Sequence, residues 1–273
     1  MKTTRLRPTV SWMAFVFGWI VLSSSRTVAQ QPETPELRQE LAKLAATADS
    51  LEHSLPSFAC QEEVVSEMLA GKKVKEHVVF TAEVRTRRDS DGLLNETFTM
   101  QTLNGKPVVW RKSSKGNYVR FNLPVYIKGG FDHAMSYFSS VRQECYRFSL
   151  AAGRIDFETA PDVASHSRCR DDQVHGFALL DAQGDAVHIE RRVSAEAAEK
   201  FHLASNAVID LAPVALGGRT FWLSQRLTAE EPVGPRTARF EAAYTGCHLF
   251  AATVTIGPAT DVEPGDGSST SHP

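Results

Sequence analysis

Cysteine and histidine are the residues of this sequence with the clearest potential for chemistry. Cys60 stands in the stretch LPSFACQEE and could be a nucleophile, a metal ligand or one half of a disulfide. Cys247 is followed directly by His248, and a cysteine beside a histidine is the pairing used in nucleophilic catalysis. Neighbouring residues on a strand point to opposite faces, however, so this adjacency does not bring the thiol and the imidazole together.

Other patterns that carry chemistry are weak. The sequence has no HExxH, CxxC, GxSxG or GxGxxG motif. Cys169, Asp171 and His175 lie close along the chain, but a cysteine in a disulfide offers a metal no thiolate. Glu62 and Glu63 are adjacent, and we interpret them as solvated rather than as an acid–base pair, because a strand separates neighbours. We therefore predict no catalytic residue, no metal site and no cofactor.

The first residues of the chain have the plan of a secretory signal peptide. Lys2, Arg5 and Arg7 precede an apolar run from Trp12 to Leu22, and small residues follow it. The run is well short of the roughly 20 residues that a membrane helix needs, so an uncleaved anchor is the weaker alternative. We expect residues 1–29 to be removed, and the mature chain to be soluble, periplasmic or extracellular, with no transmembrane segment.

Charge argues against a nucleic-acid partner. Removing residues 1–29 removes four of the 30 basic residues and none of the 32 acidic ones, so the mature chain has a net negative charge. Binding to a phosphate backbone needs a concentrated positive surface. The composition therefore points away from DNA and RNA.

The four cysteines are best explained as two disulfides. Cys60, Cys145, Cys169 and Cys247 all remain after export, into a compartment where disulfides form and persist. Three pairings are possible. We favour Cys145 with Cys169, which flank a predicted hairpin, and Cys60 with Cys247, which would join the start of the first strand to a final hairpin.

One long amphipathic helix is predicted after the signal peptide. The segment TPELRQELAKLAATADSLEHSLP starts with Thr34, a proline and a glutamate, a typical helix start, and Pro56 ends it. Its apolar residues recur at spacings of three and four, which places them on one stripe. These residues are Leu37, Leu41, Leu44, Ala48, Leu51 and Leu55. We expect this helix to pack on a sheet.

Beyond Pro56 the apolar period changes to two, which predicts strands. Val78, Phe80, Ala82 and Val84 alternate with residues of the other face. Similar alternation recurs in residues 98–100, 119–123, 146–150, 155–157, 187–189, 221–223, 240–244 and 250–256. Turn signals separate the runs, namely AGKK at 70, DSDG at 89, LNGK at 103, AAGR at 151, DAQGD at 181, LGGR at 216 and YTGC at 244.

These spacings predict roughly ten short antiparallel strands in a mainly β, α+β domain. Two helical segments interrupt them, at residues 129–141 and 194–205. The first places Phe131, Met135 and Phe138 on one apolar stripe. Residues 257–273 have no apolar periodicity and are rich in Gly, Ser and Pro, so we expect a disordered tail after one domain of residues 30–256.

A helix followed by such a sheet, interrupted midway by apolar helical segments, resembles the LolA/LolB-like fold of periplasmic lipoprotein carriers. The stretches SLPSFACQEE, APVALGGRTFWLSQ and YTGCHLF look like a group of uncharacterised secreted bacterial proteins. The resemblance implies a curved, antiparallel half-barrel sheet whose concave apolar face is covered by short lid helices. It also implies a cavity lined by Phe80, Val84, Phe98, Met100, Val119 and Phe121, with Phe131, Met135 and Phe138 on the lid.

Two functions follow from this resemblance and the missing catalytic motifs. The first is a non-enzymatic envelope protein that binds a lipid, an acyl chain or a lipidated protein in an apolar cavity. The alternative is a scaffold module that holds another envelope protein and has a packed core without a ligand, since the same aromatic residues could simply fill the core.

Overall fold

The computed structural model describes most of the chain between residues 34 and 250. The described residues are 34–109, 123–128, 130–131, 133–163, 169, 173–201 and 204–250. The predicted signal peptide, residues 1–29, and the predicted tail, residues 257–273, lie outside them, as do Val119 and Phe121.

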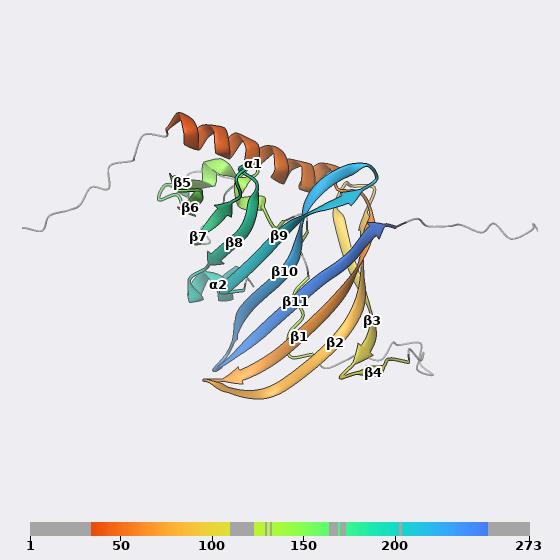
Figure 1. Cartoon of the computed structure of the whole chain (residues 1–273). Helices are drawn as coiled ribbons and strands as arrows, with labels where there is room; N and C mark the ends of the chain where they lie inside the picture. The colour runs from red at the N-terminus through yellow and green to blue at the C-terminus, as the bar shows by residue number, and fades with distance from the viewer. Residues whose placement is uncertain are drawn as a thin grey trace, which may run out of the picture. The chain divides into compact units, whose positions relative to one another are not determined.

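The described residues form two α-helices, two 3₁₀ turns and a series of strands (Figure 1). In chain order these are α1 (Pro35–Ser54), β1 (Phe58–Ala70), β2 (Lys73–Arg88), β3 (Leu94–Leu103), β4 (Lys106–Pro107), η1 (Ser136–Phe138), η2 (Gln143–Cys145), β5 (Tyr146–Ala151), β6 (Arg154–Thr159), β7 (His175–Leu180), β8 (Ala186–Arg192), α2 (Ala195–Phe201), β9 (Asn206–Leu216), β10 (Arg219–Val233) and β11 (Arg236–Leu249).

The predicted N-terminal helix is confirmed as α1. The Thr34 side chain caps it by accepting a hydrogen bond from the backbone N–H of Leu37 at 3.2 Å. All six residues of the predicted apolar stripe are buried. At the other end, the Arg88 guanidinium of β2 donates to the carbonyls of Glu52 and Leu55. These are carbonyls that a helix end leaves without intrahelical partners, so Arg88 fastens α1 to the sheet.

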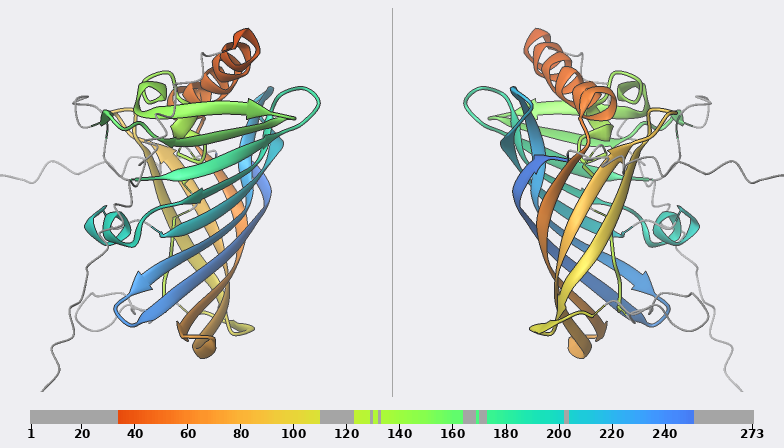
Figure 2. Two further views of the ribbon diagram at one scale, coloured as in Figure 1. Left: turned by 90° about the vertical axis from the view of Figure 1, so that its left-hand side faces the viewer. Right: turned by 90° about the vertical axis from the view of Figure 1, so that its right-hand side faces the viewer.

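All the described strands join one open antiparallel sheet. Its order is β4-β3-β2-β1-β11-β10-β9-β8-β7-β6-β5, so the first long strand pairs with the last one in the middle of the sheet. The sheet is curved and strongly twisted, and β5–β8 run steeply across the direction of β1–β3 (Figure 2). The predicted mainly β, half-barrel fold is confirmed, with eleven described strands instead of about ten.

All but one of the predicted turns join neighbouring strands. Asn104 and Gly105 both have positive φ, of 49° and 75°, as a type I′ hairpin requires. The turn predicted at YTGC is wrong, because these residues lie within β11. Gly246 has a φ of 59° there, and Gly246 and Cys247 lie opposite the single residue Cys60 of β1, which makes a β-bulge.

Residues 129–141 do not form the predicted helix. Their described part contains turns and the single 3₁₀ turn η1, although Phe131, Met135 and Phe138 are all buried as expected. Phe138 packs against the rings of Phe148 and Phe157, with centroid distances of 5.8 and 5.5 Å. Packing of the individual aromatic rings thus outweighs the modest helix propensity of this segment. The predicted helix at residues 194–205 is confirmed as the shorter α2.

Residues 123–128, which we call the crossing segment, lie on the inner face of the sheet, where the buried side chains of β1–β3 gather. The Ser66 hydroxyl of β1 donates to the carbonyl of Val125 at 2.7 Å and accepts from its N–H at 3.0 Å. The Tyr126 ring packs on Phe98, with centroids 4.2 Å apart, and edge-on against Phe240 at 5.7 Å. The crossing segment thereby fills the half-barrel over β1–β3 and β11.

Gly176 of β7 lies where strands come too close for a side chain. A Cβ at this position would overlap the carbonyl oxygen of Glu190 and lie 3.0 Å from the Cα of Arg191. We predict that Gly176→Ala lowers the free energy of unfolding by roughly 1–3 kcal/mol, because backbone atoms cannot move aside easily. Chemical denaturation measures this, and Ser149→Ala at an exposed position of β5 is the control. Equal losses in the two variants would contradict the prediction.

Candidate functional site

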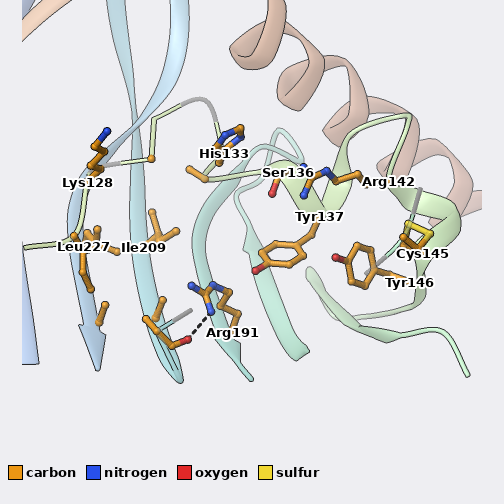
Figure 3. A pocket seen from close by; sticks show the side chains of 17 residues that line it. Lys128, His133, Ser136, Tyr137, Arg142, Cys145, Tyr146, Arg191, Ile209 and Leu227 are labelled. Atoms are coloured by element: carbon orange, nitrogen blue, oxygen red, sulfur yellow. Dashed lines mark hydrogen bonds between the residues drawn. A yellow bond between two sulfur atoms is a disulfide. The ribbon is translucent and has the colours of Figure 1, made fainter. Parts of the chain in front are cut away.

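A cavity of about 550 Å³ lies beside the part of the half-barrel that the crossing segment fills (Figure 3). Its floor is made of apolar side chains from β9 and β10. Ile209 lies directly opposite Leu227 in the sheet, and Ala207 lies opposite Ala229. Because strand residues two apart share a face, the register places all four on the cavity side. The two alanines leave space that larger residues would fill.

The opposite wall of the cavity comes from the middle of the chain. Ile127 and Lys128 of the crossing segment contribute to it, as do the turn that leads into η1 and the disulfide between Cys145 and Cys169. Figure 3 shows the aromatic side chains of Tyr137 and Tyr146 beside this wall. The site is therefore apolar at its floor and mixed at its wall.

Among the described residues of the cavity lining, every side chain that carries a permanent charge is a cation. These are Lys128, Arg142 and Arg191, which line the cavity together with His133, and no described carboxylate lines it. Within the part of the chain that the structure describes, no ion pair involves Lys128, Arg142 or Arg191. Arg191 Nη1 donates to the carbonyl of Ala204 at 2.9 Å, which orients its guanidinium.

The cavity residues expected from the resemblance lie elsewhere. Those that the structure describes are in the packed core and do not line this cavity, namely Phe80, Val84, Phe98, Met100, Phe131, Met135 and Phe138. Tyr126 occupies the space in front of Phe98 and Phe80. A second cavity bounded by these residues stays a prediction. The sequence did not predict this lining, because Ala207 of β9 and Ala229 of β10 resemble any other small residue on a strand.

Glu62 is a buried acid on β1, away from the cavity lining. Only 1% of its surface is exposed, so the interpretation of Glu62 as solvated is wrong, whereas Glu63 does point to solvent. The strand separates the two neighbours as expected, but it directs Glu62 into the core. The Tyr126 hydroxyl donates to its Oε2 over 3.4 Å, and Oε1 has no hydrogen-bond partner among the described residues.

The surroundings of Glu62 favour its neutral form. Burial raises the pKa of Glu62 to about 7, the hydroxyls of Tyr244 and Tyr126 lower it in part, and the charge of Glu96 raises it. Burial and the nearby carboxylates raise the pKa of Tyr126 and Tyr244 well above the usual range of tyrosine. Such a shifted carboxyl is a candidate for acid–base chemistry, but its burial leaves no room for a substrate.

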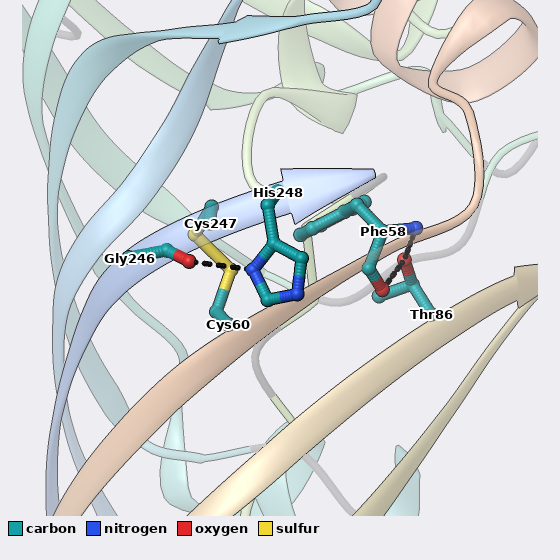
Figure 4. Close-up of a disulfide and its surroundings, with 6 residues drawn as sticks. All are labelled: Phe58, Cys60, Thr86, Gly246, Cys247 and His248. Carbon is teal, nitrogen blue, oxygen red and sulfur yellow. Dashed lines mark hydrogen bonds between the residues drawn. A yellow bond between two sulfur atoms is a disulfide. The ribbon is translucent and has the colours of Figure 1, made fainter. Parts of the chain in front are cut away.

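Both disulfides have the pairing favoured from the sequence. Cys60 is bonded to Cys247 across β1 and β11 (Figure 4), and Cys145 is bonded to Cys169. Cys60 is completely buried, and none of the cysteines is free, so the described chain offers no thiolate nucleophile. His248 beside the bond turns its Nδ1 to the carbonyl of Gly246 at 2.9 Å. Cys60 is therefore a structural cross-link.

No group of three or more His, Cys, Asp or Glu side chains within the described ranges is placed to hold a metal ion. Among the helices of those ranges, none is both long and apolar enough to cross a membrane.

Comparisons with known proteins give similarity in structure only. The sequence matches no protein-family model, and no curated protein matches it. A DUF1329 family protein from Desulfovibrio piger is similar at 10% identity, covering 81% of this chain and 96% of that chain with a TM-score of 0.40. A protein domain assigned to outer membrane lipoprotein sorting, from Vibrio parahaemolyticus, is 12% identical over 77% of this chain and 92% of its own, also with a TM-score of 0.40.

A LolA superfamily protein from Nitrosomonas europaea is 8% identical, covering 78% of this chain and 94% of that chain with a TM-score of 0.33. These likenesses concern the fold alone.

Proposed function

We propose that this chain is an exported, non-enzymatic protein that binds a lipid, an acyl chain or the acyl chain of a lipidated protein. The observation that carries the proposal is the cavity of about 550 Å³ with its paired apolar floor of Ile209, Leu227, Ala207 and Ala229. Small-molecule sites typically measure roughly 300–1,000 Å³ and are lined mainly by apolar side chains with a few polar groups. This cavity has that size and that lining.

Export is part of the same proposal. The signal-peptide pattern of residues 1–29 motivates it, and both disulfides support it, because disulfides persist in oxidising compartments outside the cytosol. We further propose that residues 30–256 form one domain, followed by a disordered tail at 257–273.

Binding can be tested with the neutral fluorescent probe N-phenyl-1-naphthylamine and the mature chain. We expect the probe to bind, and we expect Ala207→Phe to weaken binding at least tenfold, because the added ring occupies the floor of the cavity. Ala215→Phe, at an exposed position of the same strand, is the matched control and should bind like the unaltered protein. Far-ultraviolet circular dichroism checks that both variants are folded.

A folded, unaltered protein that does not bind the probe would contradict the proposal. That result would favour the alternative, a scaffold module for another envelope protein. Equal weakening by Ala207→Phe and Ala215→Phe would also contradict it, because binding would then take place outside the cavity.

A further inference from the structure

We infer that the ligand of this cavity has a single acyl chain and an anionic head, a carboxylate or a phosphate, which Arg191 holds in a lining that also contains Lys128 and Arg142. This inference rests on the proposed function and adds the chemical class of the ligand. It starts from the separation within the cavity between an apolar floor and cationic groups.

The charge of the lining is not a consequence of composition. The whole chain has a formal net charge of −2, yet the described part of the cavity lining contains Lys128, Arg142 and Arg191 and no carboxylate. Arg142 and Arg191 are half-buried and lose part of their solvation without gaining a charged partner among the described residues, whereas Lys128 is exposed. An anionic group of a ligand would supply the partner that the described residues do not supply.

Arg191 has the geometry of an anion-binding residue. It lies on β8 directly opposite Ala207 of the cavity floor. Its Nη1 donates to the carbonyl of Ala204 at 2.9 Å, which holds the guanidinium in place. A guanidinium has five N–H donors, so this bond leaves others for the two oxygens of a carboxylate or phosphate. In Figure 3, Arg191 lies at the same cavity as Tyr137 and Tyr146.

The volume favours one acyl chain over two. At about 30 Å³ for a group of the size of a water molecule, a cavity of about 550 Å³ holds roughly 18 such groups. One acyl chain of about a dozen carbons with a small head fits this space, whereas the two longer chains of a membrane phospholipid would extend out of it. We therefore expect a single-chain amphiphile.

Displacement of N-phenyl-1-naphthylamine by four amphiphiles with the same chain tests the head group. These are dodecanoate, dodecyl phosphate, dodecanol and dodecyltrimethylammonium, each below its micellar concentration and at one ionic strength. We expect at least one of the two anions to bind about tenfold more tightly than the alcohol, and the cation to bind more weakly than the alcohol. The tighter of the two anions identifies the head as carboxylate or phosphate.

Variants test the role of the arginine. Arg191→Gln should weaken binding of the preferred anion about tenfold relative to binding of dodecanol by the same variant. Arg192→Gln is the matched control. Arg192 is the next residue of the same strand, its side chain is exposed, and it does not line the cavity. If loss of the hydrogen bond to Ala204 impairs folding of the Arg191 variant, anion binding is measured with Arg142→Gln instead.

Equal affinity for dodecanol and for both anions would overturn the inference, and so would anion binding that neither Arg191→Gln nor Arg142→Gln changes. Either result would leave the proposed function standing, provided that the neutral probe binds. Failure of the probe to bind the unaltered protein would instead remove the proposed function itself.

Discussion

Replacing Cys60 and Cys247 together by alanine is expected to lower the free energy of unfolding by about 5 kcal/mol. The bond joins residues separated by 187 positions, so it closes most of the described chain into one loop. In the chain-entropy model a cross-link restricts the unfolded state more when its loop is longer, and a loop of this length corresponds to about 5 kcal/mol. The bond also connects β1 with β11. These are the first and the last strand of the sheet along the chain, and they pair in its middle.

The second disulfide provides an internal comparison. Cys145 and Cys169 are separated by only 24 positions, which corresponds to about 3 kcal/mol in the same model. Guanidinium unfolding of the two double-alanine variants, both expressed with export, measures the difference. Loss of as much stability from the short loop as from the long one would show that loop closure is not the main contribution of the Cys60–Cys247 bond.

The stability of the protein should also depend on pH through Glu62. Burial raises its pKa from 4.5 to about 7. Between these values the folded protein keeps the proton that the unfolded chain has lost, so stability falls as pH rises. The contribution is fully present below about pH 4.5 and is lost above about pH 7. This difference in pKa corresponds to about 3 kcal/mol of stability.

Glu62→Gln isolates this contribution, because glutamine has a similar shape and does not ionise. The free energy of unfolding is measured with urea at steps between pH 4.5 and pH 8. Over this range it should fall by about 3 kcal/mol less in the variant than in the unaltered protein. The variant should therefore be the more stable of the two at pH 8. Glu63→Gln, exposed on the other face, should keep the full loss. Parallel pH profiles for Glu62→Gln and the unaltered protein would contradict the account.

Much of the fold could be predicted because it depends on local patterns. The helix α1 has a cap, an apolar stripe and a terminating proline, and each hairpin with a Gly-containing turn has a local signal. The exception is Gly246, where a glycine with positive φ accommodates a bulge within β11 and does not end a strand. A turn and a bulge need the same residue type, so sequence alone does not separate them.

The cavity could be predicted only in outline. An apolar half-barrel predicts that something covers its inner face, but the covering residue Tyr126 belongs to a segment without periodicity. Tyr126 packs against Phe80 and Phe98, which are part of the core, and the cavity lies instead over Ile209 and Leu227. Likewise, Glu62 continues the period of its strand, and only the tertiary packing shows that its face is the buried one.

The central claim is that an acyl chain lies on the floor formed by β9 and β10. Nuclear Overhauser effects between carbon-13-labelled dodecanoate and the methyl groups of the mature protein test it most directly. We expect strong effects between the chain and the methyl groups of Ile209 and Leu227. Effects confined to other methyl groups, or a ligand that shows none while the protein is folded, would contradict it.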